Sequence, residues 1–244
     1  MKNILLYLCF LCCFSVLGQS AFEKGVAYYK DQQWVLAKKQ LIQVEPVSKN
    51  YFKACEYLGD IAAHEKKWDK ALHFYDLLLK EKPDNANYNF KYGGALGLKA
   101  LELSKFQAAF YISDIKHYLK RAAALDKTHL GARWALLELY LKLPKILGGG
   151  TDVALAYANE LKAISEIDGY LAYGKIYQEI EHYKQAEKYL VKALQLGDSV
   201  TCYQKLLELY IKANFAPEKI NDLLQRANRA HPKENWNAFM AKSS

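Results

Sequence analysis

The side chains that most often carry out acid–base or metal chemistry are dispersed along this sequence. The six histidines include no pair at i and i+4 and no HExxH motif, so they do not predict a zinc site. The carboxylate pairs Glu56/Asp60 and Glu179/Glu181 have no neighbouring nucleophile or ligand set, and glycosidase chemistry would require two buried, facing acids. We therefore expect no catalytic residue, no bound metal and no cofactor.

A glycine run, Gly148 to Gly150, could form a phosphate cradle at the start of a helix. The lysine and hydroxyl residues of a P-loop do not follow it, and Asp152 would repel a phosphate. We interpret the run as a loop that ends one helix and caps the next, with Thr151 or Asp152 as the N-cap.

The first eighteen residues have the pattern of a secretory signal peptide, with Lys2, an apolar stretch from Ile4 to Leu17 and a cleavage site at Gly18. An uncleaved anchor is the alternative, but the stretch is shorter than the roughly 20 residues that span a membrane. The residues before Cys12 and Cys13 are not the small ones of a lipobox. We therefore expect an exported protein in the periplasm or at an outer membrane.

Removal of that segment would leave Cys55 and Cys202, which define no disulfide framework. Cys55 falls among predicted helix-packing positions, so we expect it to be buried. The formal charge is +8, and the lysines responsible are scattered among acids rather than gathered on one face. Together with the export signal, this distribution argues against a nucleic-acid partner.

The elements that must position any binding residue repeat every 34 residues along the sequence. Glycines, tryptophans and alanines share this period, at Gly25, Gly59 and Gly93, at Trp34 and Trp68, and at Ala37 and Ala71. The same order of small, aromatic and aliphatic residues returns at Gly174, Tyr183, Ala186, Leu190 and Ala193. Each copy contains two amphipathic helical patterns separated by a short polar break.

This pattern resembles the tetratricopeptide repeat family, in which small residues let two helices approach closely and a proline closes the unit. Gly59, Ala71 and Pro83 match those positions. The resemblance implies an all-α, right-handed solenoid of about six helix pairs, with units near 18–51, 52–85, 86–128, 129–166, 167–199 and 200–233. Within 86–128, a long connection around Leu101 to Ala109 separates the two helical patterns. Residues 234–244, with Trp236, Phe239 and Met240, are expected to form a C-terminal cap and tail.

In this family the first helices of the pairs line the concave face, and the resemblance places a set of partner-binding residues there. The set is Phe22, Tyr29, Glu56, Asp60, His64, Asn87, Phe90, Lys91, Trp134, Glu138, Leu171 and Lys175. One subclass grips C-terminal carboxylates with lysines and asparagines on this face, but here only Asn87 and Lys91 are compatible. A carboxylate clamp is therefore not expected.

These features predict a non-catalytic protein-interaction scaffold of the bacterial cell envelope that binds a protein or peptide, with envelope membrane proteins among the candidate partners. The alternative is a small-ligand-binding accessory protein of a transport system. It rests on the glycine insertion, which resembles those of some exported repeat proteins of tripartite transporters, and on the long middle connection. The sequence leaves the oligomeric state open.

Overall fold

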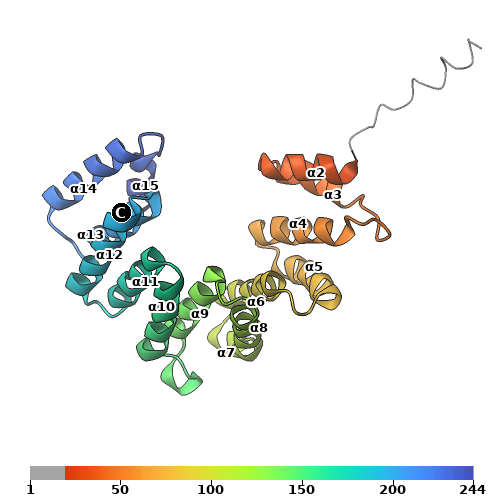
Figure 1. Ribbon diagram of the computed structural model, residues 1–244, viewed down its shortest axis with the longest axis horizontal. Helices are drawn as coiled ribbons and strands as arrows, with labels where there is room; N and C mark the ends of the chain where they lie inside the picture. The colour runs from red at the N-terminus through yellow and green to blue at the C-terminus, as the bar shows by residue number, and fades with distance from the viewer. Residues whose placement is uncertain (1–19, 244) are drawn as a thin grey trace, which may run out of the picture. The chain divides into compact units, whose positions relative to one another are not determined.

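The computed structural model describes residues 20–243, and within that range all regular structure is helical (Figure 1). The expected signal segment, residues 1–18, lies outside the described residues. The chain divides into two compact units, the first ending at Ser104 and the second beginning at Lys105. No helix among residues 20–243 is long and apolar enough to cross a membrane.

Unit 1 consists of helices that pack against their neighbours in chain order. They are α2 (Ala21–Lys30), α3 (Trp34–Leu41), α4 (Tyr51–His64), α5 (Trp68–Glu81) and α6 (Ala86–Leu101). The first helix starts at a capping box in which the Ser20 hydroxyl accepts from the Glu23 amide and the Glu23 carboxylate accepts from the Ser20 amide. The first helices of successive hairpins, α2 and α4, also contact each other directly.

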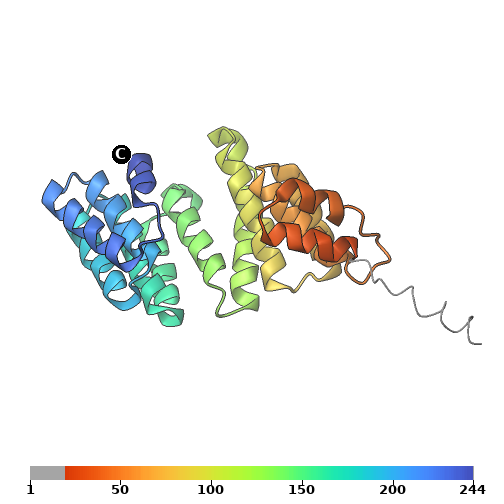
Figure 2. The same cartoon turned by 90° about the horizontal axis from the view of Figure 1, so that it is seen from above.

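Unit 2 continues the same hairpin pattern, as Figure 2 shows for the helices coloured green to blue. Its helices are α7 (Lys105–Ala109), α8 (Ile112–Leu125), α9 (Leu130–Lys142), the short 3-10 helix η1 (Lys145–Leu147), α10 (Thr151–Ile164), α11 (Glu166–Glu179), α12 (Tyr183–Gly197), α13 (Val200–Lys212), α14 (Pro217–Ala230) and α15 (Trp236–Ser243). The first helices α9, α11 and α13 contact one another in sequence. The two helices expected within 86–128 lie in different units, since α6 packs on α5 and α8 packs on α9.

The periodic glycines lie where two helices of one hairpin touch. A Cβ atom added to Gly25, Gly59 or Gly174 would lie 2.4 to 2.6 Å from the residue sixteen positions later, namely Leu41, Tyr75 or Leu190. Gly93 is also buried. At Gly25, Gly59 and Gly174 the partner helix therefore leaves no room for a side chain, which confirms the close approach expected there.

The turn between the helices of a hairpin has a repeated backbone conformation. Gln32, Lys66, Glu181 and Asn214 all have positive φ, between 52° and 60°. In each turn the following amide donates to the carbonyl five residues earlier, as Lys67 does to Ala62 at 2.8 Å. This is the hydrogen bond of a Schellman motif, which ends the first helix and directs the chain into the second.

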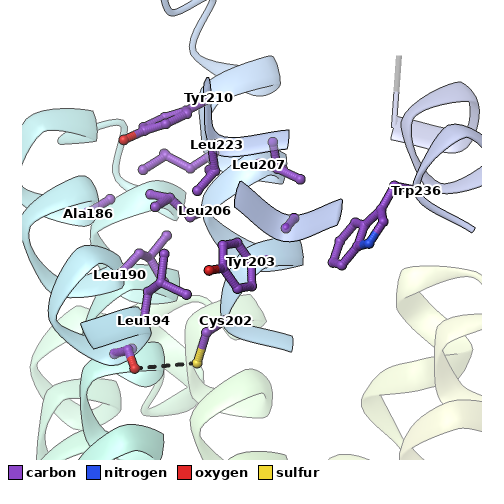
Figure 3. Packing of buried hydrophobic residues seen from close by; sticks show 13 residues of the cluster. Ala186, Leu190, Leu194, Cys202, Tyr203, Leu206, Leu207, Tyr210, Leu223 and Trp236 are labelled. Atoms are coloured by element: carbon purple, nitrogen blue, oxygen red, sulfur yellow. Dashed lines mark hydrogen bonds between the residues drawn. The ribbon is translucent and has the colours of Figure 1, made fainter. Parts of the chain in front are cut away.

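The C-terminal helix covers the last hairpin, as the cap prediction required. Trp236 is 2% exposed and packs with residues of α12, α13 and α14, including Tyr203 and Leu223 (Figure 3). Its indole nitrogen donates to the carbonyl of His231 at 3.1 Å. Cys202 belongs to the same cluster and donates from its thiol to the Ala193 carbonyl. Cys55 is buried as predicted, and both cysteines of the described range are free.

The glycine run forms a loop rather than a phosphate cradle, but its predicted cap is wrong. The N-cap of α10 is Gly150, whose φ of 127° suits glycine, and it makes no side-chain capping bond. Thr151 is already the first helical residue. The Gly150 amide donates to the carbonyl of Tyr140, and Gly149 lies so close to Leu143 that a side chain would not fit. The loop is therefore packed backbone against backbone onto the end of α9.

Candidate functional site

The predicted partner-binding residues fall on the first helices of both units, and the two sets are described separately. In unit 1 the first helices α2, α4 and α6 form what we call the first-helix face of unit 1. It carries Phe22, Tyr29, Glu56, Asp60, His64, Asn87, Phe90 and Lys91. In unit 2 the corresponding face is formed by α9, α11 and α13 and carries Trp134, Glu138, Leu171 and Lys175.

Asp60 is the centre of a hydrogen-bond network in unit 1. Both of its oxygens lie 2.6 Å from the ammonium of Lys91 on α6. The hydroxyl of Tyr75 on α5 donates to Asp60 at 2.8 Å, and that of Tyr29 on α2 donates at 3.5 Å. One carboxylate thus joins four helices, and each of its oxygens has donors.

Glu56, one turn earlier on α4, forms the second part of this network. Its side chain accepts from Lys53 at 2.8 Å and from the Asn87 amide at 3.2 Å, and it lies 3.1 Å from the Lys91 ammonium. Glu56 is 7% exposed. Burial opposes its charge, but Lys53 and Lys91 outweigh that effect and hold the pKa of Glu56 below its usual range.

The acids of the network also change the pKa values of its tyrosines, Tyr29 and Tyr75. Burial, together with the Asp60 carboxylate, raises the pKa of Tyr29 to about 12. The same two causes raise the pKa of Tyr75 further above its ordinary value. Two acids face two lysines, so the network is electrically balanced and its tyrosines stay protonated. It braces the hairpins of unit 1, and the groups of a carboxylate clamp, Asn87 and Lys91, are occupied by the chain's own acids.

The aromatic residues predicted for unit 1 mainly contact other rings. Phe22 and Tyr29 lie against Tyr57 on α4, with ring centroids 6.3 and 4.6 Å apart. His64 lies 4.7 Å from the ring of Trp34. Phe90 is half-buried on α6. The structure therefore places Phe22, Tyr29 and His64 against aromatic rings of neighbouring helices.

The predicted residues of unit 2 surround an open groove instead. A groove of about 300 Å³ is lined by Trp134, Glu138, Asp168, Leu171, Lys175, Thr201 and Lys205. All the residues predicted for this unit are among them. We call this feature the α9–α11–α13 groove.

The wall of this groove is fixed by a hydrogen bond between successive repeats. The indole nitrogen of Trp134 donates to Asp168 at 2.7 Å. The other oxygen of Asp168 accepts from the Ser165 hydroxyl at 2.6 Å, and Ser165 in turn caps α11. Trp134 packs on the buried cluster of α9 to α11, and Leu171 packs on the buried cluster of α12 to α15. Two hydrophobic cores therefore reach the surface side by side in the groove.

The lysines of the groove already have acidic partners. Lys175 lies 3.6 Å from Glu138 and 3.1 Å from Glu179, and Lys205 lies 2.8 Å from Glu208. Burial opposes the charge of Lys175, but the two glutamates outweigh it and raise the pKa of Lys175. Burial would raise the pKa of Glu179, but the neighbouring Lys175 ammonium outweighs burial and lowers this pKa. Lys175 and Glu179 therefore both stay charged around neutral pH.

Sequence reasoning missed Asp168, Thr201 and Lys205 in the groove, and Lys53 and Tyr75 in the unit 1 network. The repeat period could have located two of them, because Asp168 follows Trp134 by 34 residues and Lys205 follows Leu171 by the same interval. The network has a related signal. Tyr29, Asp60 and Lys91 are spaced by 31 residues, which is one repeat less about one helical turn.

The described residues contain no group of histidine, cysteine, aspartate or glutamate side chains that could hold a metal ion. The carboxylates of the network and of the groove are held by lysines, hydroxyls and an indole. The serine bonded to them, Ser165 beside Asp168, is the N-cap of α11 and accepts from the Asp168 amide. What the arrangement offers chemically is a contact surface, with an apolar centre in unit 2 and a satisfied polar network in unit 1.

Comparisons with known proteins agree with the helical hairpin architecture. No protein-family model matches the sequence, and no curated protein sequence matches it. A thermophilic TPR protein from Thermus thermophilus matches over 80% of this chain and 95% of its own, with a TM-score of 0.60 and 16% identity. The structure of the APC/C hetero-tetramer Cut9–Hcn1 covers 98% of this chain and 46% of its own, with a TM-score of 0.61 and 13% identity.

A third structure is YrrB, described as a TPR protein with an unusual peptide-binding site. It matches 75% of this chain and 87% of its own, with a TM-score of 0.50 and 15% identity. Identities this low establish the fold and not the function. By its hairpins, its repeat period and these structural matches, the chain has the fold of the tetratricopeptide repeat proteins.

Proposed function

We propose that this protein is a non-catalytic interaction scaffold that binds a protein or peptide segment in the α9–α11–α13 groove. The observation that carries the proposal is the exposure of apolar surface from Trp134 and Leu171 in a groove between three successive first helices. Apolar surface that is concave and bordered by polar residues is typical of a binding site.

The contrast between the two units supports this assignment. In unit 1 the polar side chains of the first-helix face are hydrogen-bonded to one another. A partner could bind Asp60 or Lys91 only by breaking the contact between them. In unit 2 the apolar surface of Trp134 and Leu171 faces the groove and is open to a partner. YrrB, whose structure is similar, is described as having a peptide-binding site.

We further propose that the scaffold works in the bacterial cell envelope, because residues 1–18 have the pattern of a secretory signal. Fractionation of cells that express the chain with a C-terminal tag tests this setting. Release of a shortened protein with the periplasmic fraction is the expected result, and a full-length cytosolic protein would contradict it.

Site-specific photo-crosslinking tests the binding site itself. Replacing Leu171 with a photoreactive phenylalanine analogue should trap a protein partner in living cells. The matched control is the same replacement at Leu196, which is 53% exposed on α12 and does not line the groove. Equal crosslinking at both positions, or none at Leu171, would remove the groove from consideration.

A bound small molecule is the competing occupant, because about 300 Å³ lies at the lower end of ordinary ligand pockets. Native mass spectrometry of the purified protein separates the two functions. A scaffold should give the mass of the chain alone, whereas a retained ligand that is lost from Trp134→Ala would favour the transport accessory.

A further inference from the structure

The charged side chains that line the α9–α11–α13 groove cancel one another. Glu138 and Asp168 are acidic, and Lys175 and Lys205 are basic. Each already has a partner of its own, since Glu138 pairs with Lys175, Asp168 accepts from Trp134 and Ser165, and Lys205 pairs with Glu208. Both lysines that line the groove are therefore already ion-paired, and the two oxygens of Asp168 are hydrogen-bonded by the Trp134 indole and the Ser165 hydroxyl.

A charged partner side chain would gain little in such a place. It would lose part of its hydration on entering the groove and would have to compete with ion pairs that are already formed. At the end of α11, Glu179 interacts electrostatically with Lys175, Lys212 and Lys142. The balance of positive and negative charge therefore extends beyond the lining residues. Electrostatic attraction is thus not what would hold a partner here.

The groove can instead bind a partner through apolar contacts with Trp134 and Leu171. The hydrogen bond from the indole nitrogen of Trp134 to Asp168 satisfies the one polar group of that side chain and fixes the ring against α11. Leu171 lies on the next first helix and is only partly covered by the core behind it. Ordered apolar side chains that are pre-positioned in this way bind without a large loss of side-chain entropy.

We infer that the groove recognises an uncharged peptide segment through one large apolar side chain, such as leucine or phenylalanine, which inserts between Trp134 and Leu171. This inference rests on the proposed function and specifies the partner. Thr201 also lines the groove, and its hydroxyl can hydrogen-bond the peptide backbone beside the inserted side chain. A groove of about 300 Å³ accommodates one such side chain rather than a folded element.

The test is selection from a displayed library of random heptapeptides on the full chain, with Leu171→Ala as the counter-selection target. The peptides recovered should share one leucine, isoleucine, phenylalanine or methionine flanked by uncharged residues. Their affinity, measured by fluorescence anisotropy, should change less than about threefold between roughly 0.1 and 1 M salt, although the Debye length falls from about 10 to 3 Å.

Variants then assign the contact. Leu171→Ala should weaken a selected peptide about tenfold, as expected for a central apolar contact, while Leu196→Ala on α12 leaves its affinity unchanged. Lys205→Glu should change the affinity less than about threefold. Trp134→Phe keeps an aromatic ring and should retain more affinity than Trp134→Ala. This conservative variant is the control for loss of binding that is caused by misfolding.

The outcomes separate the inference from the function on which it rests. Recovery of acidic or basic peptides whose affinity falls steeply with salt, or a reversal of charge preference in Lys205→Glu, would overturn apolar recognition but leave the scaffold function standing. If the library yields no groove-dependent peptide, the inference fails, and if photo-crosslinking at Leu171 also traps no protein, the proposed function fails with it.

Discussion

Replacement of Gly59 by alanine tests the close helix packing on which the fold depends. A Cβ atom at this position would lie 2.4 Å from Cε1 and 2.8 Å from Cδ1 of Tyr75, which is closer than carbon atoms can approach. The ring cannot easily retreat, because Tyr75 is 3% exposed and its hydroxyl is bonded to Asp60. By contrast, a Cβ atom on Gly94 of α6 would meet nothing within 4 Å.

The pair of variants separates steric cost from helix propensity. Alanine stabilises a helix interior by about 0.5 to 1 kcal/mol relative to glycine, and both positions are helical in the same unit. Gly94→Ala should therefore gain about 0.5 to 1 kcal/mol. Gly59→Ala receives the same gain but adds overpacking of about 1 to 3 kcal/mol. We expect Gly59→Ala to be less stable than Gly94→Ala by about 1 to 3 kcal/mol.

Urea denaturation followed by far-ultraviolet circular dichroism measures this difference. The comparison is valid where the slope of stability against urea is unchanged between the variants. Two variants that shift the midpoint upward equally would show that Gly59 is not sterically required. The argument that the glycine period records close helix contacts would then be refuted for this hairpin.

Further predictions concern the network, its pH response and the cap. Asp60→Asn should destabilise the chain by about 1 to 3 kcal/mol, because it weakens charged hydrogen bonds to Lys91. In the same urea titration Asp69→Asn, whose side chain is 84% exposed beside Lys99, should cost less than about 0.5 kcal/mol. Equal losses would argue against the network. Tyr29, with its pKa raised to about 12, keeps its proton in the folded state above the unfolded value of about 10. The contribution of Tyr29 to the free energy of unfolding is therefore complete below about pH 10 and is lost as the pH rises toward 12. Tyr29→Phe should flatten the loss of stability in that interval, and an unchanged alkaline profile would contradict this. Trp236→Ala should cost about 3 to 5 kcal/mol and speed hydrogen exchange in α13 and α14 more than in α9, whereas a uniform increase would argue against a local cap.

The repeat period was enough to predict the fold, because the physical cause of the period is local. At Gly25, Gly59 and Gly174 the second helix of the hairpin approaches too closely for a side chain, so these glycines mark three of the hairpins directly. The division of the chain after Ser104 has no such marker. It depends on which neighbours α6 and α8 pack against, and periodicity does not express that choice.

The helices that carry the candidate residues were predictable from the sequence, but the contacts of these residues were not. Register alone places Lys91 and Trp134 on first helices, yet it does not say that Asp60 would hold the Lys91 ammonium or that Asp168 would hold the Trp134 indole. Those contacts depend on the offset between adjacent hairpins, which a single sequence does not fix. The cap of α10 was missed for a similar reason, because the backbone of Gly150 rather than a side chain makes the turn.

Residues in the Schellman turns can be substituted without changing the first-helix faces. Three of the four turn residues with positive φ, Gln32, Lys66 and Glu181, are side chains that seldom adopt this conformation and lose roughly 1 to 2 kcal/mol in doing so. None of them lines the α9–α11–α13 groove. Glycine at these three sites could therefore raise thermal tolerance while the molecule keeps its choice of partner, so that durability and selectivity can be adjusted independently along one chain.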